Sequence, residues 1–480
     1  MTTAAAANPS QPKPTPKYTF DFAQFYTQLS AGNCSIFGKR IAGGKELSVL
    51  ANTDVSLSLD RDKLLIQYAD GVVKEEVPLD GSRQQINQTD VPEGGYVTFY
   101  IELLDKYFAT SIQKKYLKSN DINWLGYEKV DAPNNPRCVT GNNAPATTSY
   151  NAISISTDTA PGIIGVATPD SRKLTANPTQ SIDIESSFSV GLGVAHQAAS
   201  GDGEVEIPDS DLDNPREITD YKFFNLSDNA TEELDKLIES NSWTAPANTY
   251  NLTSAALYAD YQQTPYIWQN LPHSASDTIT YRYDPDINNL DYFLTAEGSV
   301  DASGDQWQLS TAQQLSDTQL SAGLGRTDLA DSVTVPQQEN ANIDGSGTLT
   351  AYGNGADGQA GIQRIAYQAT ESSTTVTHVI YAEANAEQTI PMFDDNGINA
   401  VISGADTLSN YDISVMYTSD NTDQRQALAA LMAEHTDPGQ SDITDLSLDN
   451  LPVLFTTYER EQLARQKKII DHYQISTSNP

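Results

Sequence analysis

Two acidic segments of the sequence place oxygen-bearing side chains at the spacing of an EF-hand calcium loop. The first, DSDLDNPREITD, spans residues 209–220. Its carboxylates at loop positions one, three, five and twelve are those of Asp209, Asp211, Asp213 and Asp220. The position that needs glycine holds Asn214, and the proline that follows disfavours the sharp turn required there. Calcium is therefore a hypothesis here, weighed against the simpler interpretation of a solvated acidic turn.

The second segment, NIDGSGTLTAYG, spans residues 342–353 and matches the same loop through its first eight residues. Its candidate ligands are Asn342, Asp344 and Ser346. Gly353 stands where a bidentate acid should complete the site, and no helix is predicted on either side. We therefore expect the protein to have no cofactor. Calcium is the only ligand that these two segments suggest.

Other patterns with known chemistry fail at specific residues. GKRIAGGK, residues 38–45, resembles a phosphate-binding P-loop, but its spacing is one residue too long and Glu46 replaces the required Ser or Thr. The five histidines form no metal-binding pair, and no G-x-S-x-G elbow of a serine hydrolase occurs. The sequence thus predicts no catalytic site. A hydrolase that uses paired carboxylates is kept as the second alternative function.

Aromatic and acidic residues coincide between Trp268 and Asp286. This segment includes Tyr281, Tyr283 and Asp284. A sugar could stack on such rings, so a glycan-binding or calcium-binding β-sandwich module is the first alternative function. The simpler interpretation is a strand whose aromatic residues lie beside a turn.

The two cysteines, Cys34 and Cys138, allow one disulfide at most. This number excludes a disulfide framework and a four-thiolate metal site. We expect two buried or idle thiols, because free cysteine behaves as a small hydrophobic residue.

The elements that must position these residues are mainly β-strands. Residues 63–68 (KLLIQY) and 72–77 (VVKEEV) flank Asp70-Gly71, which supplies the positive φ angles of a tight turn and so predicts a hairpin. Apolar stripes also predict helices, at residues 101–118, 231–239, 254–262, 423–435 and 458–473. The first and last of these helices end in basic clusters, Lys114–Lys118 and Arg465–Lys468, which we expect to dock the acidic surface of a neighbouring copy.

The fold class predicted is mainly β with inserted helices (α+β), built from two β-sandwich or jelly-roll-like units. We expect a flexible arm at residues 1–17 and a β-rich domain with one long helix at 18–220. A second β-rich domain should cover 221–420, and a helical C-terminal segment should cover 421–480. Abundant Tyr and Thr, with short apolar runs between turn residues, favour this interpretation.

The charge of the chain limits the kinds of partner that it can bind. Sixty-four acidic against 28 basic residues give a net charge of −36, which repels nucleic-acid backbones and anionic membranes. No run of eighteen apolar residues predicts a membrane span, and the first residues do not have the pattern of a secretory signal. We expect a protein made in a cytoplasm that contacts no nucleic acid directly.

These observations favour a structural subunit of a large assembly without catalytic activity. The type of assembly expected is a virion or phage-like particle put together in a host cytoplasm, with the chain as a capsid or a tail or baseplate protein. Its partners would be copies of itself, in a homo-oligomer, and other assembly proteins. This expectation rests on the composition and fold class of the chain and not on an identified site, although function resides in sites rather than in folds.

Overall fold

The computed structural model is mainly β, with 54% of residues in strands and 12% helical, which confirms the predicted β-rich α+β class with a C-terminal helix. The structure describes residues 15–55, 57, 61–103, 105–129, 131–134, 136–158, 162–197, 207–237, 239–245, 251–285, 290–302, 305–324, 348–349, 359–384, 388–404, 409–419, 424–435 and 453–479. Most of the predicted arm, residues 1–14, lies outside this range, and the first strand begins at Lys17.

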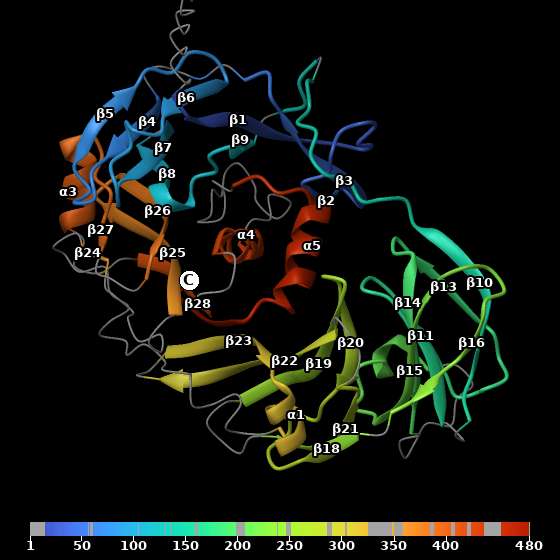
Figure 1. The fold of residues 1–480 in the computed structure, drawn as a ribbon. Helices are drawn as coiled ribbons and strands as arrows, with labels where there is room; N and C mark the ends of the chain where they lie inside the picture. Colours follow the sequence, from blue (N-terminus) through green and yellow to red (C-terminus); the bar gives the residue numbers. More distant parts are fainter. Residues whose placement is uncertain are drawn as a thin grey trace, which may run out of the picture.

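A twelve-stranded sheet organises the molecule (Figure 1). From one edge to the other its strands are β20 (Pro265–Asn270), β19 (Asn251–Tyr261), β22 (Leu290–Ala302), β23 (Asp305–Leu315), β29 (His472–Asn479), β28 (Ser409–Ser419), β25 (Gln359–Glu371), β26 (Thr374–Glu383), β8 (Lys106–Gln113), β7 (Tyr96–Leu103), β4 (Asp62–Gln67) and β5 (Val73–Val77). All neighbours are antiparallel except β26 and β8. The sheet therefore joins strands from both sides of residue 220, and the domain boundary placed there stays a prediction.

Two helices lie against one face of this sheet. Figure 1 shows α4 (Gln424–Glu434) near the centre of the molecule, with α5 (Thr457–Lys467) beside it and the strands around them. Leu428 and Leu431 of α4 pack in one core with Phe99 and Met416 of the sheet. The opposite face is covered by α3 (Asn396–Gly404), whose apolar residues join a second core. Central strands of the sheet such as β26 are thus buried on both faces.

The described strands between residues 148 and 236 form a small β-sandwich at the right of Figure 1. One sheet contains β13 (Ile182–Ser186), β10 (Thr148–Ser156) and β16 (Thr231–Glu233); the other contains β12 (Arg172–Thr175), β11 (Ile163–Ala167), β14 (Val190–His196), β15 (Ile218–Asn225) and β17 (Asp235–Lys236). The two sheets enclose Ile153, Ile164 and Phe224. The outer face of the second sheet packs on the core that holds Trp268.

The remaining strands form three smaller sheets. They are β2 (Gly38–Ala42), β3 (Lys45–Asn52), β1 (Lys17–Gln28), β6 (Arg83–Asn87) and β9 (Ile122–Lys129); β18 (Glu239–Thr244) with β21 (Thr278–Tyr283); and β24 (Thr348–Leu349) with β27 (Gln388–Thr389). Short helices occur at α1 (Asp317–Ala322), η1 (Lys114–Tyr116) and η2 (Asp209–Asp211).

The predicted hairpin at residues 63–77 is confirmed, with Gly71 at a φ of +77° in its turn. The helix predicted at 101–118 is wrong: β7 and β8 meet there in a hairpin that turns at Asp105, at a φ of 63°. Both strands are buried on both faces, and an apolar run of that kind cannot be told from a buried helix by its periodicity. The helices predicted at 231–239 and 254–262 are likewise strands.

The C-terminal helix is present but shorter than predicted. It begins at a capping box in which Thr456 and Glu459 each accept a hydrogen bond from the other's backbone N–H, and it ends at Lys467. The residues that follow form β29, which pairs with β23 on one side and β28 on the other. The end of the chain is therefore a central strand of the large sheet.

Candidate functional site

A polar cavity of about 360 Å³ lies between the large sheet and the C-terminal ends of α4 and α5. Its charged and strongly polar lining residues are Glu297, Gln308, Glu434, Lys467, Lys468, His472 and Gln474. Because side chains alternate along a strand, His472, Gln474 and Ser476 of β29 face the cavity, while Tyr473 and Ile475 enter the core behind the sheet. β29 thus builds one wall of the cavity.

Two ion pairs line the cavity, one between the ends of α5 and α4 and one between the end of α5 and β22. Lys467 donates a hydrogen bond to Glu434, and Lys468 donates one to Glu297 at 2.6 Å. Burial lowers the pKa of Lys467 despite the nearby carboxylate of Glu434. Burial would also lower the pKa of Lys468, but Glu297 outweighs it and the pKa is raised. The cavity is therefore lined by two acidic and two basic side chains that meet in two pairs.

Two buried side chains in this wall have a polar atom without a partner. The Nδ1–H of His472 donates to the carbonyl of Ile470 at 2.7 Å, so Nε2 is the ring's acceptor, and it has no hydrogen bond. Burial lowers the pKa of His472 to about 3, so the ring is neutral. Gln474 donates from Nε2 to Glu434 at 2.9 Å, and its Oε1 has no partner. Each such buried acceptor costs about 1–3 kcal/mol.

A serine, a histidine and an aspartate meet one strand away from the cavity. Ser414 Oγ lies 3.0 Å from His435 Nε2, and His435 Nδ1 lies 3.4 Å from Asp412 Oδ2. This is the order of contacts in a catalytic triad. Ser414 pairs with Ser476 of the cavity wall but is itself 0% exposed. A nucleophile must reach its substrate, so these contacts serve to attach the end of α4 to β28.

Asp412 in this group also lies beside an arginine. Its Oδ2 lies 3.1 Å from Nη1 of the buried Arg364. Burial would raise the pKa of Asp412, but His435 and Arg364 outweigh it and lower the pKa to about 2. No sequence motif marked these residues, because three different elements supply them.

The first predicted calcium loop is occupied by arginine side chains. Arg216 donates to the carbonyl of Asp211 at 2.7 Å, and Arg172 donates to the carbonyl of Leu212 at 2.8 Å. Burial, with Arg216 nearby, lowers the pKa of Arg172 to about 10, so it stays charged at neutral pH. Two fixed cations at the loop repel Ca²⁺.

The candidate calcium ligands lie on different elements. Asp209 and Asp211 are in η2, Asp213 follows them, and Asp220 is buried on β15. Within the described ranges, no three His, Cys, Asp or Glu side chains are grouped as a metal site. Asn342, Asp344 and Ser346 of the second loop lie outside the described residues. Calcium binding stays a prediction.

The aromatic segment considered for sugar stacking is part of the core. Trp268 and Tyr281 are fully buried, Tyr283 nearly so, and Trp268 donates to the carbonyl of Arg282 at 2.8 Å. Asp284 accepts from the hydroxyl of Tyr221 at 2.9 Å, and Asp286 is outside the described residues. A sugar site on these rings is therefore wrong, because no ring face is open to a ligand.

The expected basic docking clusters are paired within the chain. Lys114 binds Glu93, Lys115 lies 3.0 Å from Glu383, and Lys118 lies 3.6 Å from Asp121. In the other cluster, Lys467 has only 9% of its side chain exposed. Lys467 is paired with Glu434 at the end of α4, and Lys468 is paired with Glu297 on β22, so docking of a neighbour at residues 465–468 stays a prediction. The P-loop-like segment 38–45 is the β2–β3 hairpin.

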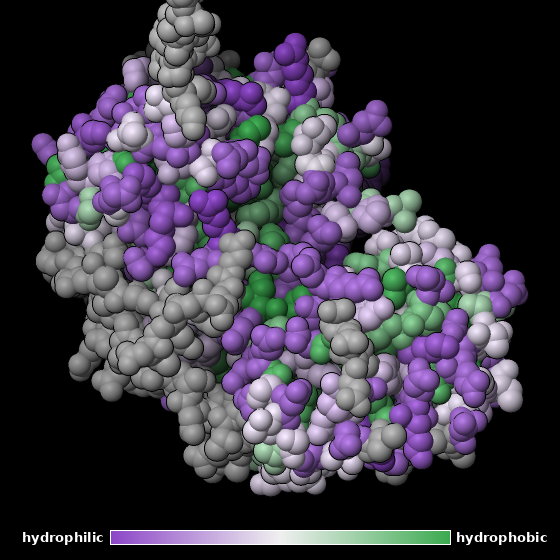
Figure 2. Space-filling model, in the orientation of Figure 1, coloured by the Kyte–Doolittle hydropathy of each residue, from purple (hydrophilic) through white to green (hydrophobic). Residues whose placement is uncertain are grey.

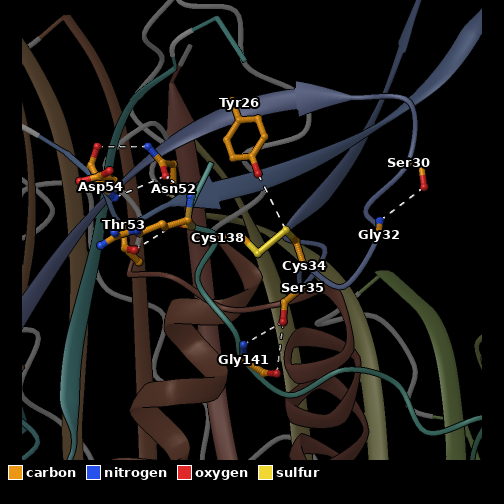
Figure 3. Close-up of a disulfide and its surroundings, with 11 residues drawn as sticks. Tyr26, Ser30, Gly32, Cys34, Ser35, Asn52, Thr53, Asp54, Cys138 and Gly141 are labelled. Carbon is orange, nitrogen blue, oxygen red and sulfur yellow. Dashed lines mark hydrogen bonds between the residues drawn. A yellow bond between two sulfur atoms is a disulfide. The ribbon is translucent and has the colours of Figure 1, made fainter. Parts of the chain in front are cut away.

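Cys34 and Cys138 form a disulfide, which corrects the expectation of free thiols (Figure 3). Their Cα atoms are 5.6 Å apart across a sequence separation of 104 residues. The bond joins the β1–β2 loop to the segment after β9. Ser35 reinforces this contact, since its hydroxyl donates to the Gly141 carbonyl and accepts from the Gly141 N–H at 2.8 Å.

Comparisons with family models, curated proteins and solved structures found no match to this chain. No helix in the described ranges has the length and apolarity needed to cross a membrane. Hydrophilic residues cover most of the described surface on the face drawn in Figure 2, as expected for a net charge of −36.

Proposed function

We propose that this protein is a structural subunit of a large assembly, a capsid, tail or baseplate protein of a virion or phage-like particle. The observation that carries the proposal is an apolar patch formed by Tyr68, Val72 and Met392. Their exposed fractions are 44%, 48% and 41%. Single exposed apolar residues are ordinary, but a group of them on a strongly charged protein favours a protein contact.

The patch is held rigidly. Tyr68 N–H donates to the carbonyl of Val72 at 2.9 Å across the β4–β5 turn, and Met392 N–H donates to the carbonyl of Gly71 at 2.8 Å. A side chain at Gly71 would meet the Ile390 carbonyl, so the turn and the segment at 390–392 fit closely. A rigid patch loses little entropy on binding.

The position of the patch favours a second copy of the chain as its partner. The turn leads directly into β5, the last strand of the large sheet in the described part of the chain. A sheet edge offers backbone hydrogen bonds to a neighbouring chain, and symmetric association of identical chains is the commonest form of oligomer.

The disulfide and the charge support the same proposal. Disulfides persist in oxidising surroundings, which include virion surfaces. A net charge of −36 disfavours contact with a packaged genome, so the subunit would lie in the shell or on its outside.

Substitutions in the patch test the proposal. We expect purified wild-type protein to form oligomers by light scattering coupled to size exclusion, and Val72→Asp with Met392→Asp to reduce them to smaller species. Ile41→Asp, at a residue 78% exposed on β2, is the matched control and should assemble like wild type. Unchanged assembly in the double variant, with folding intact by circular dichroism, would overturn the assignment of the patch.

A further inference from the structure

A chain of buried hydrogen bonds crosses five neighbouring strands of the large sheet. The hydroxyl of Tyr367 on β25 lies 3.0 Å from Nδ1 of His378 on β26, and Nε2 of that ring lies 2.7 Å from the hydroxyl of Ser111 on β8. Ser111 lies 2.5 Å from the hydroxyl of Thr98 on β7, which donates to Oε1 of Gln67 on β4 at 3.1 Å. All five side chains are 0% exposed, so water does not reach this chain of bonds.

The chain of bonds ends at the exposed patch. Gln67 donates from Nε2 to the backbone carbonyl of Met392 at 3.1 Å, and the ring of Phe393 packs on that of His378 with centroids 5.3 Å apart. Met392 and Phe393 belong to residues 388–404, here called the cover segment, whose helix α3 packs on β25 and β26 on the side away from α4 (Figure 1). The cover segment therefore closes the sheet over His378 and also supplies one residue of the patch.

The hydrogen bonds of His378 fit its neutral ring. A neutral imidazole has one acceptor and one donor nitrogen, so Nδ1 accepts from Tyr367 while Nε2–H donates to Ser111. A proton added at Nδ1 would remove the acceptor of the Tyr367 hydroxyl and place a charge in the core. Burial alone lowers the pKa of His378 to about 3. The closed cover segment thus excludes the charged form of this ring.

The titratable groups around His378 in the described part of the chain do not offset a charge on its ring. On β25 the ring faces Tyr367, whose pKa is raised by burial, and on β8 it faces a serine hydroxyl. The cover segment brings two carboxylates: Asp394 accepts from the hydroxyl of Tyr100 at 2.6 Å, and Asp395 accepts from a backbone N–H at the start of α3 at 2.6 Å. Both carboxylates are thus used to hold the cover segment itself.

We propose that acid opens the cover segment over His378 and so takes apart the patch through which copies of the chain associate. The inference rests on the proposed function of the patch, because Met392 belongs to both the patch and the cover segment. Opening exposes the ring to water, where a histidine has a pKa of about 6.5. Each pH unit below this value should therefore increase the open population about tenfold.

Hydrogen–deuterium exchange of wild-type protein, read by mass spectrometry between pH 7 and pH 5, tests the opening. After correction for the intrinsic exchange rate at each pH, peptides from residues 388–404 should exchange about tenfold faster for each unit below pH 6.5. They should also exchange faster than peptides of α4 on the other face, which identifies a local opening. His378→Gln, a polar side chain that does not titrate, should remove the pH dependence of the cover segment. His472→Gln, at a buried histidine on the α4 side of the sheet, is the matched control and should retain it.

The comparison of the cover segment with α4 uses wild type alone, so it stands even if His378→Gln does not fold. Equal exchange of both segments, exchange of the cover segment that does not respond to pH, or the same pH dependence in His378→Gln would overturn the proposal.

Light scattering of the same samples separates this inference from the proposed function. Oligomers of wild type formed at pH 7 should dissociate at pH 5, and those of His378→Gln should persist. Absence of oligomers at pH 7 would contradict the proposed function and this inference with it. Wild-type oligomers that persist at pH 5 would contradict only the inference.

Discussion

Lys467 at the end of α5 donates a hydrogen bond to Glu434 at the end of α4, and Glu434 also accepts from Gln474 of β29. One carboxylate therefore connects both C-terminal helices to the central strand of the large sheet. This contact, rather than an exposed charge, explains why lysines occur at the end of α5.

Charge reversal at Lys467 should destabilise the fold of the chain rather than block a contact between copies. Lys467→Glu places two carboxylates together in a buried position, and loss of a buried pair typically costs about 3–5 kcal/mol. Urea unfolding followed by fluorescence measures the change. Lys118→Glu, at an exposed pair with Asp121, is the control and should cost less than about 1 kcal/mol. Equal stability of Lys467→Glu and wild type would contradict the role given to this residue.

Removal of the disulfide should also destabilise the chain. The bond closes a loop across a separation of 104 residues, so Cys34→Ser with Cys138→Ser should cost about 4.7 kcal/mol by the chain-entropy estimate. Thermal unfolding of the double variant, and of wild type with and without a reductant, measures the effect. A wild-type melting temperature that does not respond to reduction would show that the bond contributes nothing.

The buried histidines make stability depend on mildly acid pH. Burial lowers the pKa of His378 and of His472 to about 3, and that of His196 falls well below its usual value. The unfolded chain binds these protons near pH 6.5 and the folded chain does not, so stability is complete above 6.5 and falls as pH decreases. Each histidine should remove about 1.4 kcal/mol per pH unit in this window.

Urea unfolding at a series of pH values between 7 and 4 measures this dependence, and His472→Gln should make the slope shallower. His273→Gln, at an exposed position, is the control and should leave the slope as it is. A wild-type stability that stays constant across this range would contradict the burial of these rings.

Asp412 should add a separate loss of stability at lower pH. Its pKa of about 2 in the folded protein is below that of an ordinary carboxyl, so the unfolded chain takes up the proton first. The contribution is complete above pH 4 and disappears as pH falls toward 2. Asp412→Asn should lower stability at pH 7 and make its decrease below pH 4 shallower. Parallel curves for the variant and wild type would contradict the ion pair with Arg364.

Ser414 should not react as a nucleophile. Its side chain is fully buried, although its hydroxyl lies 3.0 Å from His435. A fluorophosphonate probe should leave it unlabelled by mass spectrometry, and Ser414→Ala should cost about 1 kcal/mol of stability for the lost hydrogen bond. Specific labelling of Ser414 would contradict the burial of its side chain.

The parts of this fold that could be predicted are those specified locally. The hairpin at 63–77 depends on an Asp-Gly turn, and α4 on a short apolar stretch without breakers. The error at 101–118 arose because β7 and β8 are buried on both faces, so their apolar residues do not alternate. Burial of that kind is a property of the whole sheet and is absent from the local pattern.

The candidate site could not be predicted because its residues come together only in the folded chain. Glu297, Glu434 and His472 lie far apart in the sequence and meet only because β29 enters the sheet beside β23. The disulfide between Cys34 and Cys138 could not be predicted for a similar reason, since a separation of 104 residues gives no sign that the two cysteines lie close together. The aromatic segment at 268–283 shows the opposite error. Its residues suggested a sugar site, and they are instead part of the hydrophobic core.

The size of the particle formed by the purified wild-type chain tests the proposed function most directly. Negative-stain microscopy and light scattering, with and without calcium, should show closed or ordered assemblies of many copies. These assemblies should form without reduction of the disulfide. A strict monomer in both conditions, at concentrations where the protein is folded, would contradict the proposal that this chain is a structural subunit.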